Sequence, residues 1–144
     1  PAKPLGPLRD ALADLMWEKA GILRDGPSLN EAARGLEALE AELRGCGVAD
    51  GARGFNLSWA EWLNLESLIL VSRAIVLAAA AREESRGAHW REDFPHTRDE
   101  REGLAHTRVW LEGGGLRLGW RDVAFTRVRP GESLLVPAAG PPAS

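Results

Sequence analysis

The sequence predicts a mainly α-helical domain: an up-down-up bundle of three helices of the spectrin-repeat type, followed by a short β-hairpin and a loose C-terminal tail. Before residue 94, apolar residues recur at helical spacing in three long segments that glycine and proline separate. After residue 106, apolar and polar residues alternate, which is typical of strands. We therefore expect one domain, divided into the bundle (1–94), a loop and β-hairpin extension packed on it (95–136) and a flexible tail (137–144).

The first two helices follow from their apolar stripes and their end signals. Proline suits the first turn of a helix, so the first helix is expected to begin near Pro7 and to end at the Asp-Gly-Pro run at 25–27. A second helix is expected to open at Ser28, whose hydroxyl would form a capping box with the carboxylate of Glu31. The Gly-Cys-Gly run at 45–47 would end it.

The third helix is predicted to be the longest and the most apolar. Ser58 and Glu61 offer another capping box and Gly87 a C-terminal stop, which together give about 29 residues and a length of about 43 Å. Little of its circumference is polar, so we expect other elements to cover it on several sides. Because Glu66 and Arg73 interrupt its apolar run, we predict a core helix without direct membrane insertion.

The hairpin follows a stretch of mixed charge at 95–106, which we expect to be a solvated loop. Two strands are expected at 107–111 and 116–120, with the turn between them at 112–115. Val123, Phe125 and Val128 predict a third short extended segment.

Composition argues against several classes of protein. A net charge of -3 gives no overall attraction to nucleic acid, and the acids interspersed among Arg117, Arg121 and the other hairpin arginines favour a salt-linked face. The single cysteine, Cys46, can form neither an intrachain disulfide nor a thiolate zinc site, so the sequence suits a reducing, cytoplasmic location. Residues 1–7 lack the pattern of a signal peptide.

No set of residues has the spacing of a catalytic or metal site. His89, His96 and His106 lie near carboxylates, but no pair has the close helical spacing that preorganises two metal ligands. Ser85 lies near His89 without the strand-turn-helix elbow that presents a nucleophile. The glycine run at 113–115 leads into no helix that could hold a phosphate. We therefore predict neither catalytic residues nor metal ligands in this chain.

Six tryptophans are many for a chain of this length, and Trp90 and Trp110 lie outside the predicted helices. Their large faces belong either to the internal core or to a surface that meets a second protein. On the second interpretation, Trp90, Trp110 and the alanine run at 78–81 would favour self-association of the isolated chain.

The stretch 84–95, which reads Glu-Ser-Arg-Gly-Ala-His-Trp-Arg-Glu-Asp-Phe-Pro, resembles the C-terminal region of the flavoprotein subunit of succinate dehydrogenase and fumarate reductase. Residues 16–26, 64–68 and 121–126 are similar to other parts of that region, in the same order. L-aspartate oxidase is a close relative of this family, but its region usually lacks the closing hairpin. Asp122 departs from the family, which commonly has proline at that position.

The resemblance implies an accessory C-terminal domain of an FAD-dependent oxidoreductase of the succinate or fumarate class. The flavin and the residues that bind the dicarboxylate would belong to separate flavin-binding and capping domains, so this chain would bind no cofactor and would not catalyse alone. Its partners would be those two domains, together with an iron-sulfur subunit, in electron transport at the cytoplasmic inner face of a membrane. The alternatives are the C-terminal domain of an L-aspartate oxidase and a stand-alone helical protein-interaction module.

By the same resemblance, four residues would lie in a loop that faces the flavin domain and would order it through charge-assisted hydrogen bonds. These residues are Arg86, His89, Arg91 and Asp93. The alternative is that they only fold this loop onto its own helix.

Overall fold

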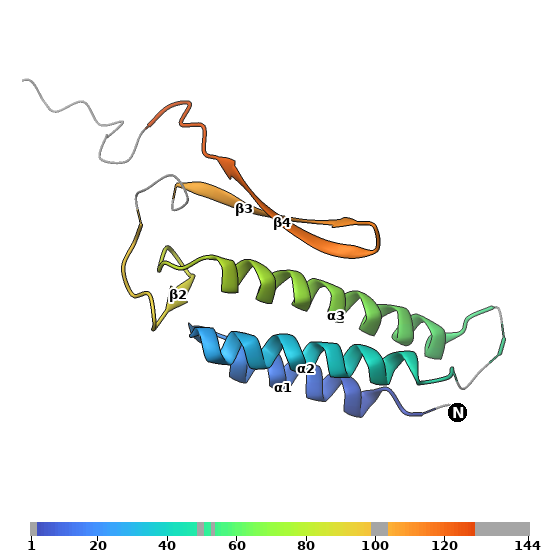
Figure 1. Cartoon of the computed structure of the whole chain (residues 1–144). Helices are drawn as coiled ribbons and strands as arrows, with labels where there is room; N and C mark the ends of the chain where they lie inside the picture. The colour runs from blue at the N-terminus through green and yellow to red at the C-terminus, as the bar shows by residue number, and fades with distance from the viewer. Residues whose placement is uncertain (1–2, 49–50, 53, 99–103, 129–144) are drawn as a thin grey trace, which may run out of the picture.

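The computed structural model describes residues 3–48, 51–52, 54–98 and 104–128. Within them, three long helices, α1 (Gly6–Ala20), α2 (Gly26–Arg44) and α3 (Leu57–Ala81), precede an antiparallel hairpin of β3 (Ala105–Glu112) and β4 (Gly115–Asp122). Figure 1 shows α3 lying between the hairpin on one side and α1 and α2 on the other. The predicted fold class, a helical bundle followed by a hairpin, is therefore confirmed.

The core of the bundle is built from one apolar stripe on each helix. In α2, the side chains of Leu29 and Leu36 are fully buried, and Ile69 of α3 is almost so. The other buried residues of the three helices recur at intervals of three, four, seven or eight, which keep side chains on one helix face; they are Leu8, Leu12, Ala20, Ala32, Leu43, Leu65, Ser72, Val76 and Ala79. Helix α2 packs against both of the other helices and holds the bundle together.

The predicted capping boxes at Ser28 and Ser58 are wrong. Helix α2 begins at Gly26, with Pro27 in its first turn, and the carboxylate of Asp25 accepts the backbone N–H of Ser28 at 2.6 Å. The side chain of Asn56 caps α3 in the same way, because its Oδ1 accepts the N–H of Trp59 at 2.8 Å. In both helices, a residue earlier in the chain satisfies the free N–H groups, so the serines lie within the first turn.

Replacing Asn56 with alanine is expected to lower the free energy of unfolding by about 1 kcal/mol, because the N–H of Trp59 loses its acceptor. The Ser58→Ala variant is the matched control and should change stability by less than about 0.5 kcal/mol. Urea denaturation of both variants measures the difference. A larger loss of unfolding free energy for Ser58→Ala than for Asn56→Ala would show that Ser58, and not Asn56, caps α3.

Helix α3 ends earlier than predicted, at Ala81 instead of Gly87, and has 25 residues. Arg82 leaves the helix in an extended conformation, and side-chain donors from the following loop take over the last carbonyls of the helix. Gly87 instead lies in a tight turn with φ of 58°, a left-handed conformation that glycine adopts without strain.

The hairpin is present and longer than predicted. Its turn consists of Gly113 and Gly114, with φ of 60° and 80°, and the strands pair in a register that places Val109 opposite Leu118. Two positive φ values in succession are typical of the turn that matches the twist of two-residue hairpins. The hairpin contacts α3 through both of its strands.

The predicted third extended segment is wrong for the described residues, because Val123, Phe125 and Val128 belong to no strand. A pairing that the sequence did not predict does occur: β1 (Leu23–Arg24) and β2 (Trp90–Arg91) form a two-residue parallel pair. It joins the connection between α1 and α2 to the loop after α3. The predicted tail (137–144), the preceding residues 129–136 and residues 99–103 of the predicted loop lie outside the described residues.

Candidate functional site: the loop after the third helix

The candidate site is the segment 82–98, which we call the motif loop. It leaves α3 at Arg82, turns back on itself and then runs as β2 beside β1. The turn is closed by two backbone hydrogen bonds between Arg86 and His89, of 2.8 and 3.0 Å. The N–H of Glu92 continues the pairing by donating to the carbonyl of Arg24 at 2.8 Å. Backbone hydrogen bonds therefore fix the loop both at its turn and beside β2.

Arg91 is the buried centre of the motif loop. Its side chain is 3% exposed, and its Nη1 donates to the carbonyls of Ala79 and Ala80 at 3.0 and 3.2 Å. Its Nε and Nη2 donate to the two oxygens of Asp93, both at 2.7 Å. A guanidinium at the C-terminus of a helix complements the helix dipole and satisfies carbonyls that have no partner within the helix. Arg91 therefore caps α3.

Asp93 extends this contact to a second helix. Its Oδ2 accepts the backbone N–H of Gly26, the first residue of α2, at 2.8 Å. The Arg91–Asp93 pair thus connects the C-terminus of α3 to the N-terminus of α2, with the sign of charge that each end favours. The hydrogen bonds from Arg91 lower the pKa of Asp93 to about 2, against the opposing effect of burial.

This pKa predicts a loss of stability in acid. The folded-state pKa of Asp93, about 2, lies below the ordinary value of about 3.9. The stabilisation is therefore complete above about pH 4 and is lost as the pH falls towards the folded-state pKa. Thermal melts between these pH values should show a shallower acid dependence for Asp93→Asn than for the unchanged chain. The control Asp14→Asn, on exposed α1 surface, should keep the full slope. Equal slopes for the unchanged chain and Asp93→Asn would contradict this account.

Glu84 forms a second buried cluster. Its carboxylate is 2% exposed, pairs with the guanidinium groups of Arg82 and Arg86, and accepts the backbone N–H of Arg98 at 2.9 Å. Arg82 reaches onward to the hydroxyl of Thr107, on β3, at 3.2 Å. Burial raises the pKa of Glu84, but the Arg98 N–H and the two arginines outweigh it, so the net direction is downward. The cluster ties the motif loop to the base of the hairpin.

His89 joins the motif loop to β1. Its Nδ1 lies 3.0 Å from Nη1 of Arg24, and its Nε2 lies 3.1 Å from the carbonyl oxygen of Arg82. A guanidinium can only donate, so Nδ1 accepts and Nε2 carries the proton. Burial lowers the pKa of His89 further than its bond to the Arg82 carbonyl raises it, and nearby arginines add to the decrease. Both ring nitrogens of a neutral imidazole are therefore in use, and neither remains for a metal ion.

The hydroxyl of Ser85 is also engaged by backbone groups. It accepts the N–H of Arg91 at 2.9 Å and donates to the carbonyl of Phe94 at 2.9 Å. Across the part of the chain that the structure describes, no three histidine, cysteine or acidic side chains gather as metal ligands do. In the described residues, the polar groups of the loop form hydrogen bonds and ion pairs with other groups of the chain.

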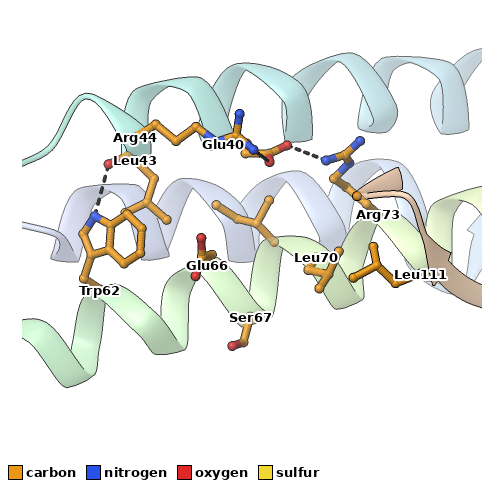
Figure 2. A pocket seen from close by; sticks show the side chains of 11 residues that line it. Glu40, Leu43, Arg44, Trp62, Glu66, Ser67, Leu70, Arg73 and Leu111 are labelled. Atoms are coloured by element: carbon orange, nitrogen blue, oxygen red, sulfur yellow. Dashed lines mark hydrogen bonds and ion pairs between the residues drawn. The ribbon is translucent and has the colours of Figure 1, made fainter. Parts of the chain in front are cut away.

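Two of the cavities in the described part of the chain lie beside the motif loop and beside α3. One of about 470 Å³ lies beside the motif loop, where Arg82, His89 and Phe125 are among its lining residues. The other, of about 220 Å³, lies between α2, α3 and the tip of the hairpin (Figure 2). There, Arg73 reaches across to Glu40 at 2.5 Å, and Nε1 of Trp62 donates to the carbonyl of Leu43 at 3.2 Å. These contacts tie α3 to α2 by ion pairing and hydrogen bonding.

The structure brings the four predicted interface residues, Arg86, His89, Arg91 and Asp93, into one loop. The side chains of these four residues bond to backbone and side-chain groups of this chain, which supports the alternative that they fold this loop. Whether they also face a partner stays a prediction. Trp90 and Trp110 are 43% and 41% exposed, so each has a face available for the predicted self-association.

Sequence reasoning missed the residues that support these four. The buried carboxylate of Glu84 and the guanidinium of Arg82 precede the turn, and Arg24 approaches it from 65 positions away. Glu84 lies within the motif and could have been singled out as the acid among its arginines. Arg24 lies within the stretch 16–26 that resembles the family, but nothing in the local sequence indicates that it contacts this loop.

Comparison with known proteins agrees with this architecture. The family described as "Fumarate reductase flavoprotein C-term" matches residues 9–135. The chain is 45% identical over 129 residues to the fumarate reductase flavoprotein subunit of Mycobacterium tuberculosis, a match that covers 87% of the chain and 22% of that protein. It is 36% identical over 91 residues to the L-aspartate oxidase of Pyrococcus horikoshii, covering 63% of the chain and 15% of that protein.

Solved structures of related flavoprotein chains have a similar fold over most of this chain. The chain superimposes on the FrdA chain of E. coli quinol fumarate reductase with a TM-score of 0.82 and 28% identity, over 90% of this chain and 23% of that one. It superimposes on a chain of the Mycobacterium smegmatis Sdh1 complex with a TM-score of 0.71 and 26% identity, over 90% and 22% of the two chains. The chain thus spans about a fifth of the length of the relatives that it matches.

Proposed function

Because this chain belongs to the family of fumarate reductase flavoprotein C-terminal domains, we propose that it serves as the accessory C-terminal domain of an FAD-dependent oxidoreductase of the succinate dehydrogenase and fumarate reductase type. The observation that carries the proposal is the family match over residues 9–135, which spans the bundle, the motif loop and the hairpin together. The reaction of the whole protein would be hydride exchange between the flavin and a dicarboxylate.

The flavin would be held outside this chain. Dinucleotide sites are built at the glycine-rich turn between a parallel strand and a helix. In the described residues, the parallel strands are the two-residue β1 and β2, and neither leads through such a turn into a phosphate-binding helix. The residues described here therefore do not fit FAD, and this chain would contribute a rigid scaffold and a surface.

The proposed partners are the flavin-binding and capping domains of the same protein and an iron-sulfur subunit, at the inner face of a membrane. The similarity to chains of a quinol fumarate reductase and of the Sdh1 complex supports this assignment. The first name describes a reductase, and the second names a complex.

A second candidate is the C-terminal domain of an L-aspartate oxidase, which the similarity to the Pyrococcus protein supports. That match covers 91 residues, whereas the match to the fumarate reductase subunit covers 129. The longer match, together with an intact hairpin, favours the succinate and fumarate class. The remaining alternative, a stand-alone helical interaction module, predicts a native gene product of about this chain's mass.

A chimera tests the proposal. In the Mycobacterium tuberculosis subunit, the 129 matching residues would be replaced by those of this chain. We expect the chimera to retain flavin through gel filtration and to oxidise a reduced dye with fumarate. A version that lacks the region should lose bound flavin. If the chimera behaves no better than the deletion although the isolated chain folds, the proposed function is wrong.

A further inference from the structure

Helix α3 exposes an apolar face that none of the described elements covers. Leu63, Ser67, Val71 and Ile75 follow one another at four-residue intervals, and Asn64 and Leu68 lie beside them. All six side chains are exposed, and we call them the open face of α3. Val71 is 56% exposed, and Leu68, Leu63 and Ile75 are 48, 46 and 44% exposed.

The charged residues of this part of the helix lie elsewhere. Glu66 and Arg73 are seven residues apart, which is two helical turns, and both line the cavity that separates α3 from α2 and the hairpin tip. Ser67 also lines this cavity, at its border with the open face, and its side chain points away from α2 in Figure 2. The open face therefore contains no charged side chain over about three turns of the helix.

The other sides of α3 are occupied. Leu65, Ile69, Val76 and their buried neighbours face the bundle, and the hairpin lies over the side that carries Leu70 and Leu77. A contiguous exposed apolar surface on a folded domain marks an interaction site. The open face is therefore a candidate interaction surface.

Two observations favour a partner within the same polypeptide. The chain spans 22 to 23% of the relatives that it matches over most of its length, so about four fifths of such a protein lies outside it. A segment of the same polypeptide is present at high effective concentration and needs no charge for steering. Separately, the charged groups of Arg86, Arg91 and Asp93 are engaged within the chain, whereas Leu63, Leu68, Val71 and Ile75 remain exposed.

A lipid surface fits the open face less well. By length and composition α3 is apolar enough to span a membrane, with a mean hydropathy of 1.7 over its most apolar stretch. Helices that lie on anionic membranes carry basic residues beside their apolar face. The one basic residue within Leu57–Ala81 is Arg73, which pairs with Glu40 on another side of the helix.

We propose that the open face of α3 is the surface by which this domain packs against the rest of its flavoprotein subunit, an inference that rests on the proposed function. The motif loop then has a different role: it fixes the ends of α2 and α3 so that the open face is presented as one rigid surface.

The test places a charge on the open face in two settings. In the isolated chain, Val71→Glu should leave helix content and the thermal midpoint unchanged, because the side chain is exposed and glutamate favours a helix. In the chimera, the same substitution should reduce the flavin retained by about tenfold or more, because an unpaired carboxylate would be buried at the contact.

The matched control is Ala13→Glu on α1, an exposed position whose neighbours on the helix surface include Arg9, Asp10 and the exposed Trp17. It should retain flavin as the unchanged chimera does. If the unchanged chimera holds flavin and Val71→Glu retains as much as Ala13→Glu, this inference fails and the proposed function stands. If the unchanged chimera holds no flavin, the proposed function fails.

If the open face instead serves the domain itself, a lipid surface or a second copy of the chain, the same variant gives a different result. Each of these results overturns the inference. Unfolding of the isolated chain by Val71→Glu would show that the face is needed within the domain itself. Binding of the chimera to vesicles of phosphatidylcholine and phosphatidylglycerol that Val71→Glu abolishes would assign the face to lipid. A dimeric chimera that Val71→Glu separates into monomers with their flavin retained would assign it to a second copy.

Discussion

Replacing Arg91 with alanine is expected to lower the free energy of unfolding by about 3 to 5 kcal/mol, the cost of removing one partner of a buried ion pair. The guanidinium is 3% exposed and bonds to the carbonyls of Ala79 and Ala80 and to both oxygens of Asp93. Its removal leaves those two carbonyls without this donor and releases Asp93 from its hold on the N–H of Gly26. The C-terminus of α3 and the N-terminus of α2 should then separate.

Urea denaturation monitored by circular dichroism measures this loss. The matched control is Arg117→Ala on the hairpin, where an arginine 63% exposed lies 3.6 Å from Glu112. Exposed pairs of this kind contribute about 0 to 1 kcal/mol, so the control should be nearly neutral. A similar small effect for Arg91→Ala would show that the motif loop does not connect the helices in the way described here.

The Glu84→Gln substitution is expected to cost about 3 kcal/mol, at the lower end of the same range, because glutamine keeps the shape but not the charge. Arg82 and Arg86 would lose their shared counter-charge, and the side chain of Arg82 is only 14% exposed. Proton exchange of the β3 and β4 amides should accelerate as well, since Arg82 bonds to Thr107 at the base of the hairpin. The readouts are urea denaturation and amide exchange.

The control for this variant is Glu83→Gln, which changes the same charge one position earlier at a site with greater exposure. It should leave both the unfolding free energy and the exchange of the hairpin amides unchanged. Equal effects of the two substitutions would indicate that the loss reflects net charge alone and not the Glu84 cluster.

The sequence was sufficient to predict the three helices and the hairpin, because each has a periodic apolar pattern of several turns or strand positions. It misplaced the helix starts at Ser28 and Ser58 because Asp25 and Asn56 are equally good caps, and only the backbone geometry decides between neighbours. The end of α3 was misplaced for a different reason. Arg91, ten residues after the helix, satisfies its last carbonyls, and a contact of this kind leaves no local signal.

The motif loop shows a similar division. Its residues could be singled out from the sequence, but their partners could not, because the contacts of Asp93 with Gly26 and of His89 with Arg24 span 67 and 65 positions. The parallel pairing of β1 with β2 involves two residues on each strand, too few for any alternation to be visible. The apolar character of α3 predicted that other elements would cover it on several sides. Its open face is the side that no described element of this chain covers.

The central claim, that the open face of α3 meets the rest of a flavoprotein subunit, is tested most directly by thiol labelling at position 71. The natural Cys46 is buried and is the single cysteine of the chain, so Val71→Cys introduces one accessible thiol. Mass spectrometry of the peptide that carries residue 71 gives its labelling rate in the isolated chain and in the chimera. We predict rapid labelling in the isolated chain and a rate at least about tenfold lower in the chimera, with Ala13→Cys labelled equally fast in both. Equal rates at position 71 in the two settings would contradict the claim.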